Sequence, residues 1–150
     1  MIFAFSVFLK TVLTTLKMLF YKETRERQKN FIEFDQKSSP GATMLNIPHS
    51  RGAIYTRNAL IDSSKLIRQR VEVLAVAPGA YIDPHYCHSV RHIESSRDFV
   101  PRFDSFGRKS CRGTMTTLKS HAGTKLHDHD FRSPTYQFAI KKRIYMYLSN

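Results

Sequence analysis

The chain has 150 residues, and its 24 lysines and arginines exceed its 12 aspartates and glutamates by a formal charge of +12. This length accommodates one domain of ordinary size and excludes two full domains. With 6 glycines, 6 prolines and 2 cysteines, a collagen-like chain and a disulfide-dense secreted scaffold are also excluded.

Residues 1–20 read MIFAFSVFLKTVLTTLKMLF, a stretch that predicts an apolar helix about 30 Å long. Its polar residues Ser6, Lys10, Thr14 and Lys17 recur at helical spacing and form one narrow stripe. We therefore expect a membrane-type helix. The expected anchoring residues are Phe3, Phe5, Phe8, Leu9, Leu13, Leu16, Leu19 and Phe20.

Several alternatives remain open for this segment: a helix that spans the bilayer or lies on it, a mitochondrial presequence, and a helix buried in the fold. Cleavage as a secretory signal is disfavoured, because no base precedes Lys10 and no small-x-small site follows the apolar stretch. The basic residues between Lys22 and Lys29 predict that the following part of the chain, including the basic C-terminal part, lies in the cytosol. We thus expect a membrane localisation, with a mitochondrial one as the alternative.

Alternating charges predict that residues 22–36 extend this helix, so that 1–36 form one N-terminal unit. Ser-Pro, Pro-Gly and Ile-Pro steps mark 37–55 as a linker. Residues 56–150 are expected to form a small basic region with a thin hydrophobic core, for which partial disorder is an open alternative.

Thr56–Arg70 is predicted to contain a short helix, with Asp62 or Ser63 as its N-cap. The Val-rich run Arg70–Ala77 predicts a buried strand. The segment 81–132 has no clear periodicity, and the alternation from Tyr136 to Leu148 favours a strand or strand pair over a helix. The predicted fold class is a low-order α+β fold: an N-terminal apolar helix, then a loosely packed region with a few short strands and long irregular segments.

One candidate metal site lies in the stretch IDPHYCHSVRH. Its ligands would be His85, Cys87, His88 and His92, since imidazole and thiolate are typical zinc ligands. A second ligand pair at recognisable spacing is missing, and chance clustering of histidines in a basic chain is the alternative.

A second string, His127-Asp128-His129-Asp130, is similar to the H-x-H-x-D-H motif of metallo-β-lactamase-like hydrolases. The resemblance implies a hydrolytic metal centre. It covers four residues only, and Phe131 and Arg132 stand where the motif has Asp and His. A solvated, pH-sensitive loop is the preferred interpretation.

The chain contains no G-x-S-x-G, Walker A or G-x-G-x-x-G string. No set of catalytic residues is legible, and we therefore predict a protein that is not an enzyme and has no cofactor.

Most of the excess positive charge follows Pro101, in a stretch where arginines and lysines alternate with phenylalanines. Such a pattern is typical of contacts with phosphates, either in nucleic acid or in anionic lipid. The candidate binding residues are Arg102, Arg108, Lys109, Arg112, Lys141, Lys142 and Arg143.

The leading hypothesis is a small basic membrane-associated protein that acts through interactions with anionic lipid or an acidic protein. An orphan reading frame under modest selection for a packed fold fits the same pattern. The alternative is an RNA-binding subunit of a ribonucleoprotein, in an organelle or elsewhere. The sequence does not identify a protein partner.

Overall fold

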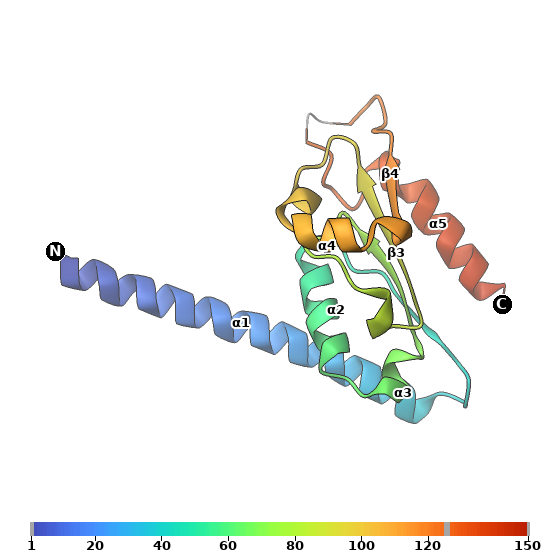
Figure 1. Ribbon diagram of the computed structural model, residues 1–150, viewed down its shortest axis with the longest axis horizontal. Helices are drawn as coiled ribbons and strands as arrows, with labels where there is room; N and C mark the ends of the chain where they lie inside the picture. Colours follow the sequence, from blue (N-terminus) through green and yellow to red (C-terminus); the bar gives the residue numbers. More distant parts are fainter. Residues whose placement is uncertain (1, 125–126, 150) are drawn as a thin grey trace.

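A computed structural model describes residues 2–124 and 127–149, with side chains at 13, 14 and 17–124 and at 127–149. Within these ranges, four parallel strands form one sheet in the order β1-β2-β3-β4 (Figure 1). The strands are β1 (Met44–Asn46), β2 (Val71–Val76), β3 (Ser89–Ser95) and β4 (Met115–Leu118). The register places Met44 beside Val71, Val73 beside Val90 and His92 beside Met115.

The helices are α1 (Ile2–Lys37), α2 (Arg51–Ile61), α3 (Lys65–Arg68), α4 (Ser105–Ser110) and α5 (Pro134–Leu148). Three 3₁₀ turns, Pro84–Tyr86, Val100–Phe103 and Arg112–Thr114, complete the described elements. A helix separates β1 from β2, as a parallel pair requires. The chain therefore has a mixed α/β architecture built on a parallel sheet.

The alternation of β2 explains why helices cover both faces of the sheet. Val71 and Val73 join a core cluster with residues of α1 and α2, including Phe31 and Leu60. Leu74 and Val76 belong to a second cluster, which contains Tyr136 and Ile140 of α5. Strand β2 is buried on both faces, which is typical of a central parallel strand.

The predicted strand at 136–148 is wrong, because this segment forms α5. The helix begins at Pro134, after Ser133, whose hydroxyl accepts a hydrogen bond from the Thr135 backbone N–H. Tyr136 and Ile140 are buried, whereas Phe138 between them is 75% exposed. Residues four apart share a face in a helix and also in a strand, so the apolar alternation fitted both structures.

The predicted strand at 70–77 is confirmed as β2. The helix predicted within Thr56–Arg70 divides into the end of α2 and the short α3, and Ser64 rather than Asp62 or Ser63 caps α3. The segment 81–132, expected to be irregular, contains β3, α4 and β4. The linker predicted at 37–55 contains β1 and the first turn of α2.

The expected transmembrane helix and membrane localisation are corrected by the structure: in the part of the chain that it describes, no helix combines the length and hydropathy needed to cross a bilayer. The described side chains of α1 continue into a charged segment and pack on α2, where the Phe20 and Tyr55 rings meet edge to face at 5.2 Å. Leu13 and Leu19 are 49% and 52% exposed. The other predicted anchoring side chains, Phe3, Phe5, Phe8, Leu9 and Leu16, lie outside the described residues.

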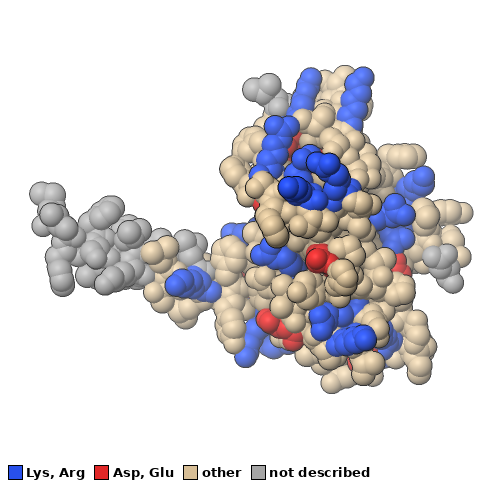
Figure 2. Space-filling view, in the orientation of Figure 1, with Lys and Arg blue, Asp and Glu red and all other residues tan. Residues whose placement is uncertain are grey.

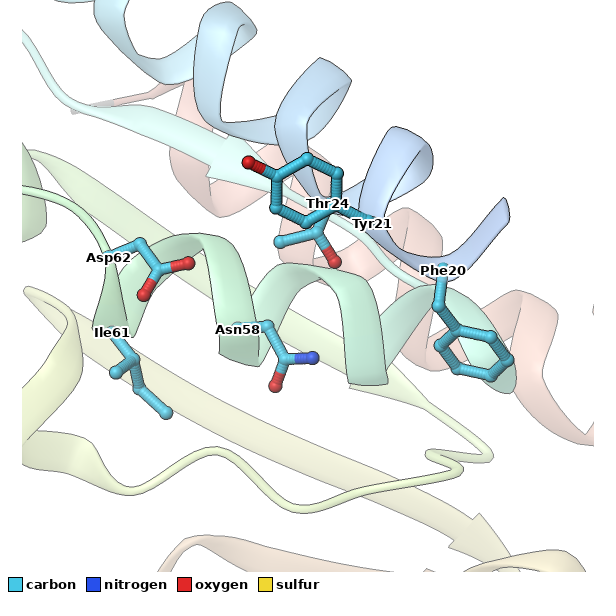
Figure 3. Close-up of a pocket in the computed structure, with 6 residues that line it drawn as sticks. All are labelled: Phe20, Tyr21, Thr24, Asn58, Ile61 and Asp62. Atoms are coloured by element: carbon cyan, nitrogen blue, oxygen red, sulfur yellow. The ribbon is translucent and has the colours of Figure 1, made fainter. Parts of the chain in front are cut away.

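A hollow of about 330 Å³ lies between α1 and α2 (Figure 3). Gln28 of α1 donates a hydrogen bond to the Asp62 carbonyl at 2.8 Å, which joins the two helices at the end of α2. The hollow is lined by Phe20, Tyr21, Thr24, Asn58, Ile61 and Asp62.

Candidate active site

Three polar residues from distant parts of the chain meet at the carboxyl edge of the sheet. Ser50 follows β1, Asp98 follows β3, and His129 lies in the loop between β4 and α5. In an open parallel sheet this edge is where ligands are usually bound, because the loops that leave neighbouring strands converge there.

Ser50 occupies a sharp turn between β1 and α2. Its backbone has φ 51° and ψ −122°, in a region that a residue with a Cβ rarely adopts. The Ser50 N–H donates to the Val76 carbonyl at 3.1 Å, and the Val76 N–H donates to the Pro48 carbonyl at 2.8 Å. The end of β2 therefore holds the turn in this conformation, and such strain is typical of functional sites.

Gly79 permits the close approach of the next loop to this turn. Its N–H donates to the Ser50 carbonyl at 2.9 Å, and a Cβ at position 79 would lie 3.0 Å from the same oxygen. Ala77, at the end of β2, also has a positive φ of 45°. Two strained non-glycine residues thus lie side by side at the carboxyl edge.

Ser50, His129 and Asp98 form a continuous hydrogen-bonded series. His129 Nε2 lies 2.7 Å from Ser50 Oγ, and His129 Nδ1 lies 2.7 Å from Asp98 Oδ2. A carboxylate can only accept, so Nδ1 carries the proton and Nε2 of the neutral ring accepts the hydrogen bond from the Ser50 hydroxyl. This is the geometry and the tautomer that a serine nucleophile with a histidine base requires.

Asp98 is held from several sides. Its side chain is fully buried, Oδ1 accepts from the Val100 N–H at 3.0 Å, and Oδ2 lies 3.3 Å from the Tyr136 hydroxyl. Burial, and then the charge of Asp98, raises the pKa of Tyr136, so its hydroxyl keeps the single proton that Asp98 Oδ2 and the Asp128 carbonyl share. These contacts orient the carboxylate toward His129.

Asp128 anchors the loop that carries His129. Its Oδ2 accepts from the Ser95 hydroxyl at 2.7 Å and the Thr135 hydroxyl at 2.6 Å, and its carbonyl accepts from the Tyr136 hydroxyl at 3.0 Å. Burial by itself would raise the pKa of Asp128, but hydrogen bonds from surrounding hydroxyl groups lower it. The carboxylate is therefore charged and ties the loop to β3 and α5.

His49 supports the backbone of His129. Its Nε2 lies 2.7 Å from the His129 carbonyl oxygen, and the two ring centroids are 4.9 Å apart. Burial is the main cause that lowers the pKa of His49, so the neutral ring donates to that carbonyl. His49, directly before Ser50 in the chain, thus fixes the position of His129.

The backbone N–H of Arg51 follows Ser50 and belongs to the first residue of α2. The first N–H groups of a helix have no acceptor within the helix. This N–H is therefore a hydrogen-bond donor directly after Ser50 in the chain.

The same region also contains ligands suited to a metal. Asp98, His127 and His129 each offer one ligand atom, and these atoms lie within 4.8 Å of one another.

The four residues predicted as metal ligands from the sequence are placed differently. His92 is buried with both ring nitrogens in hydrogen bonds, to the Ile82 N–H at 3.0 Å and to the Thr114 hydroxyl at 2.9 Å.

The other three predicted ligands do not converge with His92 among the described residues. His85 is exposed and contacts Asp83 at 2.6 Å, and His88 is exposed. Cys87 is buried, and this burial raises the pKa of its thiol to about 12.

Burial of His92 predicts a pH-dependent stability. Burial lowers the pKa of His92 from 6.5 to about 4, so between these values the unfolded state binds more protons than the folded state. The contribution of His92 to the free energy of unfolding is fully present above pH 6.5 and is lost as the pH falls. By pH 4.5 we expect this group to lower the free energy of unfolding by about 2–3 kcal/mol. Urea unfolding at pH 7 and 4.5 checks this. The loss should be much smaller in His92→Gln and unchanged in the exposed control His88→Gln, and equal losses in both variants would contradict it.

Four of the predicted phosphate-binding residues gather around α4. Arg102, Arg108, Lys109 and Arg112 line one hollow of about 360 Å³ with Ser105 and Met115. Figure 2 shows a cluster of Lys and Arg side chains over this helix. Arg108 also forms an ion pair with the buried Glu94 at 2.6 Å. Lys141 and Lys142 are exposed on α5, away from this cluster in sequence.

Arg143 differs from its basic neighbours because it contacts Glu72 of β2, and both side chains are mostly buried. We expect Arg143→Ala to lower the free energy of unfolding by about 1–3 kcal/mol, since it leaves the Glu72 charge without its partner. The adjacent Lys142→Ala should change it by less than about 0.5 kcal/mol. Chemical denaturation of both variants provides the measurement. Equal effects would show that the ion pair does not stabilise the fold.

Sequence reasoning missed Ser50 and Asp98. The turn reads Pro48-His49-Ser50-Arg51-Gly52, which lacks the first glycine of G-x-S-x-G. A Cβ at Gly52 would lie 3.7 Å from Pro48, an ordinary contact, so the local packing does not depend on that glycine pattern. A usable signal was present in the largely apolar segment 44–47, which lies two residues before the Ser50-Arg51-Gly52 turn and the helix that follows it.

No family model, curated protein or solved structure matches the chain. The geometry of the site is therefore the basis for a functional assignment.

Proposed function

We propose that the protein is a serine hydrolase that cleaves an ester, thioester or amide through an acyl-enzyme intermediate. The observation that carries this proposal is the series Ser50–His129–Asp98, with contacts of 2.7 Å on both sides of the imidazole. The strained turn at Ser50 supports it, because the turn presents the hydroxyl at the carboxyl edge of the sheet.

In the first half of the reaction, Ser50 Oγ attacks the carbonyl carbon of the substrate while His129 Nε2 takes the hydroxyl proton. Asp98 stabilises the imidazolium that results, and the Arg51 N–H donates to the oxyanion. His129 then gives its proton to the leaving group as the bond between carbonyl carbon and leaving group breaks.

In the second half, a water molecule attacks the acyl group on Ser50, and His129 takes a proton from that water. The bond between Ser50 Oγ and the acyl carbon breaks, the hydroxyl regains its proton from His129, and a carboxylic acid leaves. The same three side chains serve both halves, and no further protein group needs to titrate.

The order of the three residues along the chain also supports this class. Serine, aspartate and histidine follow one another in this order, with the serine on a turn between a parallel strand and a helix, as in α/β-hydrolases. We prefer this proposal to the interaction-only hypothesis from the sequence, because structural roles alone do not account for a strained serine in contact with a histidine.

A fluorophosphonate probe tests the proposal. Such a probe bonds to an activated serine oxygen at phosphorus and releases fluoride. We expect the folded protein to be labelled and the heat-denatured protein to remain unlabelled. Equal labelling of folded and denatured protein, or none in either, would overturn the proposal.

A second candidate function, binding of single-stranded RNA, is favoured by the convergence of four cationic side chains on the hollow beside α4. Binding should weaken with added salt, and Lys109→Ala/Arg112→Ala should reduce both the affinity and the salt dependence. Lys141→Ala/Lys142→Ala is the matched control of equal charge change. Equal effects of the two double variants, or binding insensitive to salt, would count against a site at this place.

A further inference from the structure

We propose that Asp98, His127 and His129 form a binding site for Zn²⁺, and that zinc bound there inhibits the hydrolase. The inhibitory part rests on the proposed function. The binding part rests only on the geometry of the three side chains.

The ligand atoms are close to the arrangement that zinc requires. His129 Nδ1 lies 2.7 Å from Asp98 Oδ2, and His127 Nδ1 lies 4.0 Å from Asp98 Oδ1. Zinc bonds of about 2.0–2.2 Å in a tetrahedron separate ligand atoms by about 3.3 Å. For zinc to bind, His129 Nδ1 must therefore move away from the Asp98 carboxylate and His127 Nδ1 must move toward it.

The rings of the two histidines lie parallel to each other in the metal-free site. The His127 and His129 rings are parallel within 8°, with centroids 5.5 Å apart. Phe99 stacks on the other side of His127, with centroids 4.0 Å apart. A metal lies in the plane of each imidazole that binds it, so one of these two parallel rings has to turn when zinc enters.

The donor set and its access also suit zinc. Two imidazoles and one carboxylate are a common ligand set for zinc, with water in the fourth position. The His127 side chain is 38% exposed and lines a hollow of about 260 Å³, which provides an entry path from solvent. Asp98 is buried, so the ion would reach it past His127.

Zinc at this site would oppose the chemistry of Ser50. It would replace the Nδ1 proton of His129, the proton that Asp98 accepts in the metal-free site. A divalent ion on the ring disfavours the imidazolium that must form when Ser50 loses its proton. Ser50 would remain beside Nε2 but would no longer be activated.

His127 separates the two roles, because it belongs to the zinc ligands, whereas the hydrogen bond to Ser50 in the described structure comes from His129. In the full chain, zinc binding is measured by calorimetry, and the rate of fluorophosphonate labelling is measured with and without zinc. Each variant is compared with its own zinc-free rate. We expect one zinc per chain and at least a tenfold slower labelling, which a chelator reverses.

The variant His127→Gln should weaken zinc binding by about tenfold or more and lose the zinc effect on labelling. The exposed control His88→Gln should behave as the unaltered chain. Zinc binding that is absent from the unaltered chain, or equal in His127→Gln, would overturn the site. Binding that depends on His127 without any effect on labelling would overturn the inhibition. Binding that depends on His127 in a chain that never labels would support the metal site and overturn the hydrolase proposal.

Discussion

Ser50→Ala is expected to lower the rate of ester hydrolysis by about 10⁴-fold or more, because it removes the only atom that forms the proposed covalent bond to the substrate. Hydrolysis of p-nitrophenyl esters of short acids measures this effect, as release of the phenolate is followed directly. The loss should appear in kcat rather than in KM, since the serine hydroxyl acts mainly in the transition state.

The matched control for this experiment is Ser39→Ala, an exposed serine outside the site. It should hydrolyse the esters at the original rate. Both variants should unfold at similar denaturant concentrations, because Ser50 keeps its backbone contacts to Val76 and Gly79 when only the hydroxyl is removed. Ester hydrolysis that survives in Ser50→Ala would remove this residue from the mechanism.

Asp98→Asn is expected to lower kcat by about 10³- to 10⁴-fold, although the side chain keeps its size. The asparagine amide can donate to His129 Nδ1 and thereby favour the tautomer with its proton on Nε2. That tautomer donates to Ser50 instead of accepting its proton. The change therefore abolishes the base without displacing the ring.

Asp62→Asn is the control for this variant, since Asp62 is exposed and lies at the end of α2. The control should keep full activity. A comparison of kcat and KM separates a change of tautomer, which lowers kcat alone, from a displaced loop, which changes both. Full activity in Asp98→Asn would contradict the role of the carboxylate.

The parts of the fold that were predictable are those with strong local patterns. The Val-rich strand β2 could be identified because it is buried on both faces. Strand β3 could not, because it buries His92, Glu94 and Ser95, and only tertiary hydrogen bonds stabilise these polar side chains there. The sequence of α5 fits a strand as well as a helix, because its buried residues Tyr136 and Ile140 are four apart.

The site was less predictable than the fold, because three segments supply it. His129 was noticed within a histidine-rich string, but nothing in that string indicates Ser50 or Asp98 as its partners. Ser50 lies in the segment predicted to be a linker, where Pro48 stands at the position of the first glycine of G-x-S-x-G. The parallel sheet brings these residues together, and the local sequence patterns do not predict its strand order.

Mass spectrometry of the protein after fluorophosphonate treatment tests the central claim most directly. The account predicts one phosphonyl group per chain, located on the peptide that contains Ser50 and absent from Ser50→Ala. An unmodified chain, or phosphonyl groups distributed over exposed serines with Ser50 unmodified, would contradict the account.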